Sequence, residues 1–159
     1  MKKPGEFAKW IQEHSIDEYS YLANIMPIAG TSYMVGFFIC EKLSDKWRQI
    51  DSFTIRGFIC SDIGFSDDGR VYVAYVNFSY ADSAARLDDN IVEPYYRNRG
   101  IGSLGLDYIK SFLRTLGCKT LTGTKHPIPN TPDEMAKLTA FYEKNGFQQS
   151  ADNKITFYF

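Results

Sequence analysis

The chain has little of what would place it in a membrane, a secretory pathway or a nucleic-acid complex. No apolar run among its 159 residues approaches the ~18–20 residues that span a bilayer. Residues 1–6 include two lysines, but no long apolar stretch or small-residue cleavage site follows, so we expect no secretory signal. The 18 basic and 19 acidic side chains are nearly balanced, which argues against binding to nucleic acid or to a membrane surface.

Cysteine is also scarce, and its spacing is unlike that of a disulfide framework. Cys40, Cys60 and Cys118 are odd in number, lie far apart and form no Cys-x-x-Cys pair. Cys40 and Cys60 end apolar runs, where a buried thiol behaves as a small hydrophobe. We therefore expect a cytoplasmic protein without a metal site. In contrast, hydrophobic residues make up 44% of the chain, which predicts one domain over residues 1–159.

The periodicity of apolar residues predicts α+β organisation, beginning with helices. Four residues spaced i, i+3, i+4 and i+7 share one face of a predicted helix over 7–14. A capping-box pattern at residues 15–18 predicts a second helix, on which Ile25 and Met26 continue the apolar face.

Segments rich in aromatic and β-branched residues then predict strands. The pair Asp68-Gly69 predicts a hairpin turn with positive φ, and the apolar run 71–77 predicts a strand covered on both faces. Gly117 and Gly146 follow two later predicted helices. The predicted strands cover residues 33–40, 53–60, 71–80, 87–92, 119–124, 147–149 and 155–159, and the later helices cover residues 104–116 and 131–145.

A glycine-containing turn between two arginines precedes the first of these later helices. The first turn of a helix has free N–H groups, and residues 97–103 include glycines that let an anion approach them, so this turn predicts a phosphate site. Residues 61–93 carry a net charge of −5, whereas residues 94–126 carry +5. This asymmetry favours an anionic cofactor beside a cationic acceptor, although ordinary surface charge is the alternative.

Two motifs resemble those of the GCN5-related N-acetyltransferases (the GNAT superfamily). The acetyl-coenzyme A signature of that family is similar to residues 92–102, which end a strand with V-x-P and continue as R-x-x-G-x-G. Its late Y-x-x-x-G-F motif is similar to residues 142–147, although Met135 and Leu138 stand where many members have N-x-x-A. The resemblance implies a strongly bent mixed β-sheet flanked by helices, whose fourth and fifth strands splay apart around acetyl-coenzyme A.

The resemblance also implies roles for individual residues. Ile91 and Val92 would form main-chain hydrogen bonds to the pantetheine arm, and a nearby N–H would polarise the thioester carbonyl. Tyr142 would act as general acid for the departing thiolate, with simple core packing as its alternative. The residues that hold the pyrophosphate would be Arg99, Gly100, Ile101, Gly102 and Ser103, with Arg97 and Asn98 forming the turn.

The base that takes the proton of the acceptor amine is less well defined. Asp88 and Asp89 precede the signature, and strand alternation predicts that they face opposite sides, so that only one faces the acceptor. His126 is another candidate because its reference pKa is ~6.5. Cys118 follows the C-terminal end of a helix, which disfavours a thiolate, so we expect no acetyl-enzyme.

The sequence therefore favours an N-acetyltransferase that moves an acetyl group from acetyl-coenzyme A to a primary amine in a ternary complex. The acceptor, a cationic small molecule or a protein amine, stays open, and a homodimer is compatible with the resemblance. A non-catalytic acyl-coenzyme A sensor of the same fold is the alternative. A dinucleotide site is disfavoured, because Gly100, Gly102 and Gly105 follow antiparallel strands and no acid lies about 20 residues on.

Overall fold

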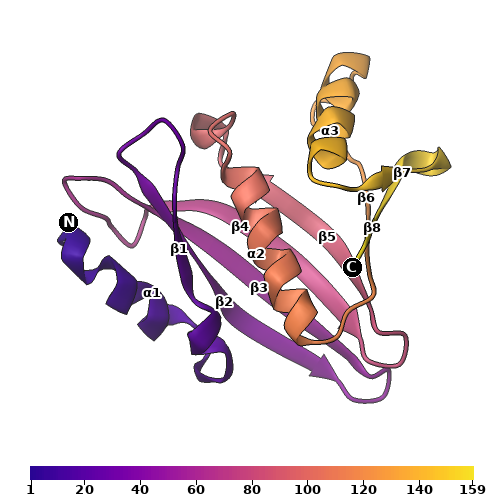
Figure 1. Cartoon of the computed structure of the whole chain (residues 1–159), viewed down its shortest axis with the longest axis horizontal. Helices are drawn as coiled ribbons and strands as arrows, with labels where there is room; N and C mark the ends of the chain where they lie inside the picture. Colours follow the sequence, from indigo (N-terminus) through magenta and orange to yellow (C-terminus); the bar gives the residue numbers. More distant parts are fainter.

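The computed structural model describes all residues from 1 to 159 and is built on an eight-stranded sheet with the order β1-β2-β3-β4-β5-β6-β8-β7 (Figure 1). All neighbouring strands are antiparallel except β5 and β6, which are parallel. The strands are β1 (Asn24–Pro27), β2 (Met34–Asp45), β3 (Ile50–Cys60), β4 (Arg70–Ser79), β5 (Ala84–Val92), β6 (Thr120–Thr124), β7 (Gln148–Gln149) and β8 (Lys154–Tyr158). The helices are α1 (Phe7–His14), α2 (Ile101–Thr115) and α3 (Pro132–Lys144), with 3₁₀ turns η1 (Pro4–Glu6), η2 (Asp17–Leu22), η3 (Pro94–Tyr96) and η4 (Ala151–Asn153).

Helices α1 and α2 cover opposite faces of this sheet. Neighbouring residues of a strand point to opposite faces, and Phe37 belongs to the cluster that includes α2, whereas Phe38 belongs to the cluster that includes α1. The larger cluster, on the α2 face, has 25 buried residues, and the smaller one has seven. Helix α3 lies to one side of α2, next to β6 and β7 (Figure 1).

A glycine in α2 allows the helix to approach the sheet closely. A Cβ atom added at Gly105 would lie 2.4–2.7 Å from the ring and hydroxyl of Tyr72 on β4. Tyr72 is 1% exposed and its hydroxyl is hydrogen-bonded, so the ring has little freedom to move away. The glycine at this position is therefore a packing requirement of the contact between α2 and β4.

We predict that Gly105→Ala destabilises the fold by about 1–3 kcal/mol, the range typical of overpacking in a well-packed core. Urea unfolding followed by circular dichroism measures this change in the free energy of unfolding. Asp107→Ala, at an exposed position of the same helix, is the control and should cost far less. Equal stability of the two variants would show that the Tyr72 ring yields easily.

Most predicted elements are confirmed, and four predictions are wrong. The capping box predicted at residues 15–18 does not form, because the N-cap of η2 is Ile16 and the Ser15 hydroxyl donates to Ile39 O instead. Residues 24–27 form strand β1 rather than a helix, because they pair with residues 34–37 of β2. The turn before β4 closes through a hydrogen bond from Gly69 N to Ser66 O, and neither Asp68 nor Gly69 has a positive φ. Strand β4 is not covered on both faces, since Tyr75 is 43% exposed.

The helices that close the predicted pattern follow their local signals. The Thr131 hydroxyl accepts a hydrogen bond from Glu134 N at 3.2 Å and so caps α3. Gly117 and Gly146 have φ of 71° and 85°, values that favour glycine after a helix end. None of the three helices combines the length and the apolar character needed to cross a membrane.

Candidate active site

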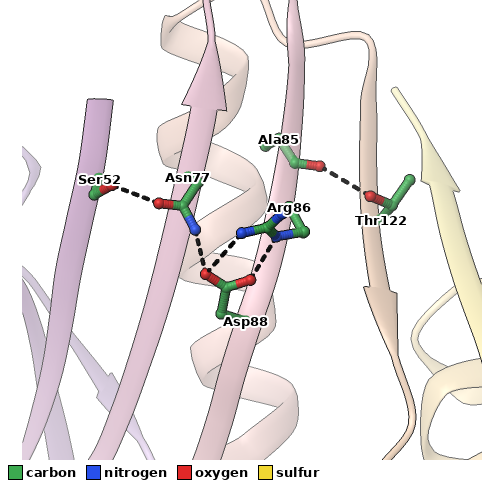
Figure 2. Close-up of polar contacts among 6 residues, drawn as sticks. All are labelled: Ser52, Asn77, Ala85, Arg86, Asp88 and Thr122. Carbon is green, nitrogen blue, oxygen red and sulfur yellow. Dashed lines mark hydrogen bonds and ion pairs between the residues drawn. The ribbon is translucent and has the colours of Figure 1, made fainter. Parts of the chain in front are cut away.

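Strands β5 and β6 separate part of the way along β5. Their pairing covers Ala84–Leu87 and Thr120–Gly123, and β5 then continues to Val92 without a strand on that side. At the paired end, the Thr122 hydroxyl donates a hydrogen bond to Ala85 O at 3.4 Å (Figure 2). The predicted splay of the strands before and after the glycine turn is therefore present. The unpaired edge of β5 is available to an extended ligand.

A β-bulge lies at the point where this free edge begins. Tyr75 of β4 pairs with Asp89, and Val76 pairs with Leu87, so Asp88 is the extra residue. The bulge interrupts the alternation of side chains, and Asp88 and Asp89 line the same cavity instead of facing opposite sides. The prediction that the two aspartates face opposite sides of the strand is therefore wrong.

The two aspartates differ in the partners that they already have. Arg86 Nε donates to Asp88 Oδ1 at 2.6 Å, and the Asn77 amide donates to the other carboxylate oxygen of Asp88. Asn77 in turn accepts a hydrogen bond from Ser52 at 2.5 Å, which completes the polar chain in Figure 2. Asp89 is exposed and has no hydrogen bond or ion pair within the protein. Asp89 is thus the aspartate free to contact a ligand.

The cavity that contains both aspartates has a volume of about 350 Å³ and lies on the α1 face of the sheet. This volume is within the range of small-molecule sites, ~300–1,000 Å³. Glu41 contributes a third carboxylate, which accepts a hydrogen bond from the Thr54 hydroxyl at 3.3 Å. Tyr75 and Leu43 add apolar surface. The cavity therefore combines negative charge with apolar walls, a combination that suits a cation with a carbon skeleton.

The turn between β5 and α2 presents backbone N–H groups without partners. Asn98 and Gly100 have positive φ, 60° and 82°, and Gly100 is the N-cap of α2. The first helical hydrogen bond runs from Leu104 N to Gly100 O at 3.1 Å, and no side chain caps the helix. The N–H groups of residues 101–103 consequently remain free at the positive end of the helix dipole. A Cβ atom added at Gly100 would meet nothing within 4 Å, so the backbone here is open to an anion.

The arginines of the turn are held by neighbouring groups. Arg97 Nε donates to Val92 O at 3.1 Å, and the Arg99 guanidinium lies 5.3 Å from the ring centre of Tyr95. No acidic residue occurs in the first turn of α2. The positive charges of Arg97 and Arg99 thus add to the field of the helix dipole at the turn.

The start of α2 packs directly against the end of α3. A Cβ atom added at Gly102 would lie 3.1 Å from the Phe141 ring, so glycine permits this contact. The Ser103 hydroxyl accepts a hydrogen bond from Asn145 at the end of α3, at 3.1 Å. The Ser103 side chain therefore helps to join the helices, while its backbone N–H and its own hydroxyl hydrogen both remain without an acceptor in the protein.

Tyr142 follows Phe141 in α3 and is 6% exposed. Burial raises the pKa of the Tyr142 phenol, hydrogen bonding with the Asn90 side chain opposes that rise, and the charge of Asp89 adds to it. The phenol is therefore protonated at neutral pH and lies within electrostatic reach of Asp89. Its ring packs against Phe147 at a centroid distance of 5.3 Å, so Tyr142 also has a packing role.

Backbone alternation distinguishes the two predicted pantetheine contacts. Glu93 N donates to Val71 O, so the backbone groups of Glu93 and Ile91 point toward β4. The backbone N–H and C=O groups of Val92 and Asn90 therefore point away from β4, to the free edge of β5. The Val92 carbonyl already accepts from Arg97 on that side.

Sequence reasoning did not find several residues of this region. Tyr72 and Asn90 are joined by a hydrogen bond of 2.5 Å, and Glu41 enters the cavity from β2. The one sequence signal for these residues was Asn90, a polar residue on an otherwise apolar strand face. Its hydrogen-bond partner could be identified only from the fold. His126 is exposed and is not among the residues that line the cavity. No group of three or more His, Cys, Asp or Glu side chains is arranged to hold a metal ion.

Comparisons with known proteins agree with this geometry. Residues 62–149, more than half of the chain, match the family model described as an acetyltransferase (GNAT) domain. No curated protein sequence matches the chain. Among solved structures, PaiA N-acetyltransferase from Thermoplasma acidophilum in complex with coenzyme A has a TM-score of 0.53 and 16% identity, over 68% of this chain and 61% of that one.

Two further solved structures show the same fold. A GNAT family acetyltransferase from Elizabethkingia anophelis with acetyl-CoA bound has a TM-score of 0.52 and 12% identity, over 68% of this chain and 76% of that one. A GNAT-family protein from Desulfovibrio desulfuricans has a TM-score of 0.51 and 19% identity, over 66% of this chain and 65% of that one. The chain thus spans less than two thirds of the length of the Thermoplasma and Desulfovibrio proteins. Together with the splayed strands and the open helix start, the family match shows that the chain belongs to the GNAT acetyltransferase family.

Proposed function

We propose that this chain is an N-acetyltransferase that moves an acetyl group from acetyl-coenzyme A to a primary amine. The observation that carries the proposal is an exposed carboxylate on the free edge of β5 together with a buried phenol on α3. Asp89 is exposed in the cavity on the α1 face, and its charge acts on the Tyr142 phenol. A base for the amine and an acid for the thiolate would then act on one thioester between them.

Acetyl-coenzyme A would be held by the turn before α2 and by the free edge of β5. The N–H groups of Ile101, Gly102 and Ser103 would bind the pyrophosphate, with Arg97 and Arg99 attracting its charge. Acetyl-coenzyme A supplies an acetyl group that is activated as a thioester. A free N–H on the β5 edge, where Asn90 and Val92 point, would stabilise the negative charge that develops on the carbonyl oxygen. We favour these two residues over Ile91 for the main-chain contacts.

The acceptor would enter the cavity lined by Glu41, Asp88 and Asp89. A protonated amine has no lone pair, so a carboxylate in reach must take its proton before or during attack. Asp89 is suited to this step because it has no partner, whereas Asp88 is occupied by Arg86 and Asn77. We therefore assign Asp89 as the base and Asp88 as a residue that maintains the bulge.

Direct attack by the amine agrees with the state of the cysteines. Burial raises the pKa of the Cys40, Cys60 and Cys118 thiols, so none of them is activated as a thiolate. No cysteine lines the acidic cavity. The acetyl group would pass to the acceptor without an acetyl-enzyme.

The test of the function is to incubate the protein with acetyl-coenzyme A and a panel of amines and to measure release of free thiol. The panel includes polyamines, aminoglycosides, amino acids and peptides with a free N-terminus. Amine-dependent release is the expected result. Binding of acetyl-coenzyme A without release for any amine would instead favour a non-catalytic sensor.

We predict that Asp89→Asn lowers kcat/KM for the amine by about 10²-fold, within the range of general base catalysis. The amide cannot take a proton, but it retains the shape of the side chain. Asp88→Asn is the matched variant, and it should act mainly on stability because it removes the partner of Arg86. Steady-state kinetics and thermal unfolding separate the two effects. A larger loss of kcat/KM in Asp88→Asn would reverse the assignment.

A further inference from the structure

The acidic cavity on the α1 face contains a row of four residues, one from each of four neighbouring strands. Glu41 of β2 lies opposite Thr54 of β3, and Thr54 lies opposite Tyr75 of β4. Tyr75 in turn lies opposite Asp89 of β5, and all four residues line the cavity. Neighbouring strands are ~4.8 Å apart, so three spacings place the two ends of the row ~14 Å apart. The cavity therefore has a carboxylate at each end of a path across the sheet.

A second polar row runs beside the first, and its groups are occupied by one another. It contains Ser52, Asn77 and Asp88, which are joined by hydrogen bonds (Figure 2). The ion pair of Arg86 with Asp88 also offsets the charge of that aspartate. The second row is thus satisfied within the protein and forms one side of the cavity. The carboxylates that are left for a ligand are those at the two ends of the first row.

Neither end of the first row has a cationic partner in the protein. The exposed Glu41 side chain accepts one hydrogen bond, from the Thr54 hydroxyl at 3.3 Å, and the exposed Asp89 side chain accepts none. Neither carboxylate takes part in an ion pair. An ionised carboxylate accepts several hydrogen bonds and donates none. Each end of the row can therefore bind an ammonium group.

The middle of the row suits a carbon chain. Thr54 is 7% exposed and its hydroxyl is used by Glu41, whereas Tyr75 is 43% exposed. An aromatic ring packs against methylene groups, and its face also attracts a cation. Leu43, which is 63% exposed, adds apolar surface to the same cavity. A ligand that lay along the row would meet charge at its ends and apolar surface between them.

We propose that the acceptor is an extended aliphatic amine with a second cationic group, bound across four strands with one ammonium at Asp89 and the other at Glu41. This inference rests on the proposed acetyltransferase function and names the substrate class of its acceptor cavity. An ion pair needs a nitrogen within ~4 Å of a carboxylate, so the two nitrogens would be ~8–12 Å apart, the span of about six to eight methylene groups. Amino acids are disfavoured, because their own carboxylate would lie beside that of Asp89.

The test uses a series of linear diamines, from propane-1,3-diamine to dodecane-1,12-diamine. Their binding to the protein without acetyl-coenzyme A is measured by isothermal titration calorimetry at low salt. Affinity should be highest between hexane-1,6-diamine and octane-1,8-diamine. The matched ligand 8-aminooctan-1-ol replaces one ammonium by a hydroxyl at the same chain length. It should bind about fivefold more weakly than octane-1,8-diamine, the worth of one ion pair near a protein surface.

Glu41→Gln is the deciding variant, since the amide oxygen can still accept from Thr54 but the charge is lost. It should lower the affinity for octane-1,8-diamine about fivefold and change that for 8-aminooctan-1-ol far less. Glu13→Gln is the matched control. It removes the same charge from an exposed position of α1 that does not line the cavity, so both affinities should be retained.

Two results would overturn the proposal. One is an affinity that does not depend on chain length, or is equal for the diamine and the amino alcohol. The other is a Glu41→Gln protein that prefers the diamine as strongly as the wild type does. Because binding needs no turnover, failure of this inference is distinguishable from failure of the proposed function. Thiol release with monoamines and no preference for diamines would refute the inference alone. Preference for diamines without thiol release would refute the acetyltransferase function and retain the diamine site.

Discussion

Gly100→Glu should abolish the binding of acetyl-coenzyme A. The glutamate would place a carboxylate beside the free N–H groups at the start of α2, where the pyrophosphate is proposed to bind. Charge-assisted hydrogen bonds are worth about 1.5–3 kcal/mol each, so loss of two of them lowers affinity by at least about 10²-fold. Isothermal titration calorimetry measures this loss directly.

Gly117→Glu is a closely matched control for this variant. Gly117 ends the same helix, also has a positive φ, 71°, and likewise has nothing within 4 Å of an added Cβ atom. The two glutamates therefore carry similar backbone strain and the same charge, but they lie at opposite ends of α2. We expect Gly117→Glu to retain affinity. Retained affinity in Gly100→Glu would contradict the proposal that the start of α2 binds the pyrophosphate.

Tyr142→Phe should lower kcat by about 10²-fold while changing the affinity for acetyl-coenzyme A little. The ring would still pack against Phe141 and Phe147, and only the donated proton is lost. A general acid typically contributes 10²–10⁴-fold to the reaction rate. Because a thiolate is already a good leaving group, we expect an effect at the lower end of this range. Pre-steady-state measurement of thiol release separates the chemical step from product release.

Tyr108→Phe is the control for the loss of a buried hydroxyl. Tyr108 is 3% exposed, and its hydroxyl has no hydrogen-bond partner in the protein. It lies on α2 against Phe37, away from the free edge of β5. Its removal should leave kcat unchanged. Equal kcat in Tyr142→Phe and the wild type would mean that Tyr142 only packs the core.

Local signals predicted those parts of the protein that depend on a few neighbouring residues. The cap at Thr131, the helix ends at Gly117 and Gly146, and the glycine turn before α2 all depend on backbone groups within one helical turn. The two family motifs added the order of the elements and the splay of β5 from β6. The caps, the helix ends and the glycine turn are each specified by residues that are close in sequence, whereas the splay was implied by the family resemblance.

The errors occurred where pairing across the sheet overrides a local pattern. Residues 24–27 have helical spacing, but hydrogen bonding to β2 draws them into the sheet. Asp88 and Asp89 alternate in sequence, and only the bulge opposite Tyr75 brings both into one cavity. The periodicity of a segment does not show which strand it will pair with, so neither result follows from the sequence alone.

By itself, the sequence determined the order of helices and strands from β2 onward, the open turn at Arg97–Ser103 and the candidate residues Asp88, Asp89 and Tyr142. Only the tertiary structure decided which aspartate is free, which backbone groups face the open edge, and that Tyr72 and Asn90 are hydrogen-bonded to each other. The physical reason is that a turn or cap is made by neighbours along the chain. A catalytic site is made by side chains whose distances depend on how strands pair and helices pack.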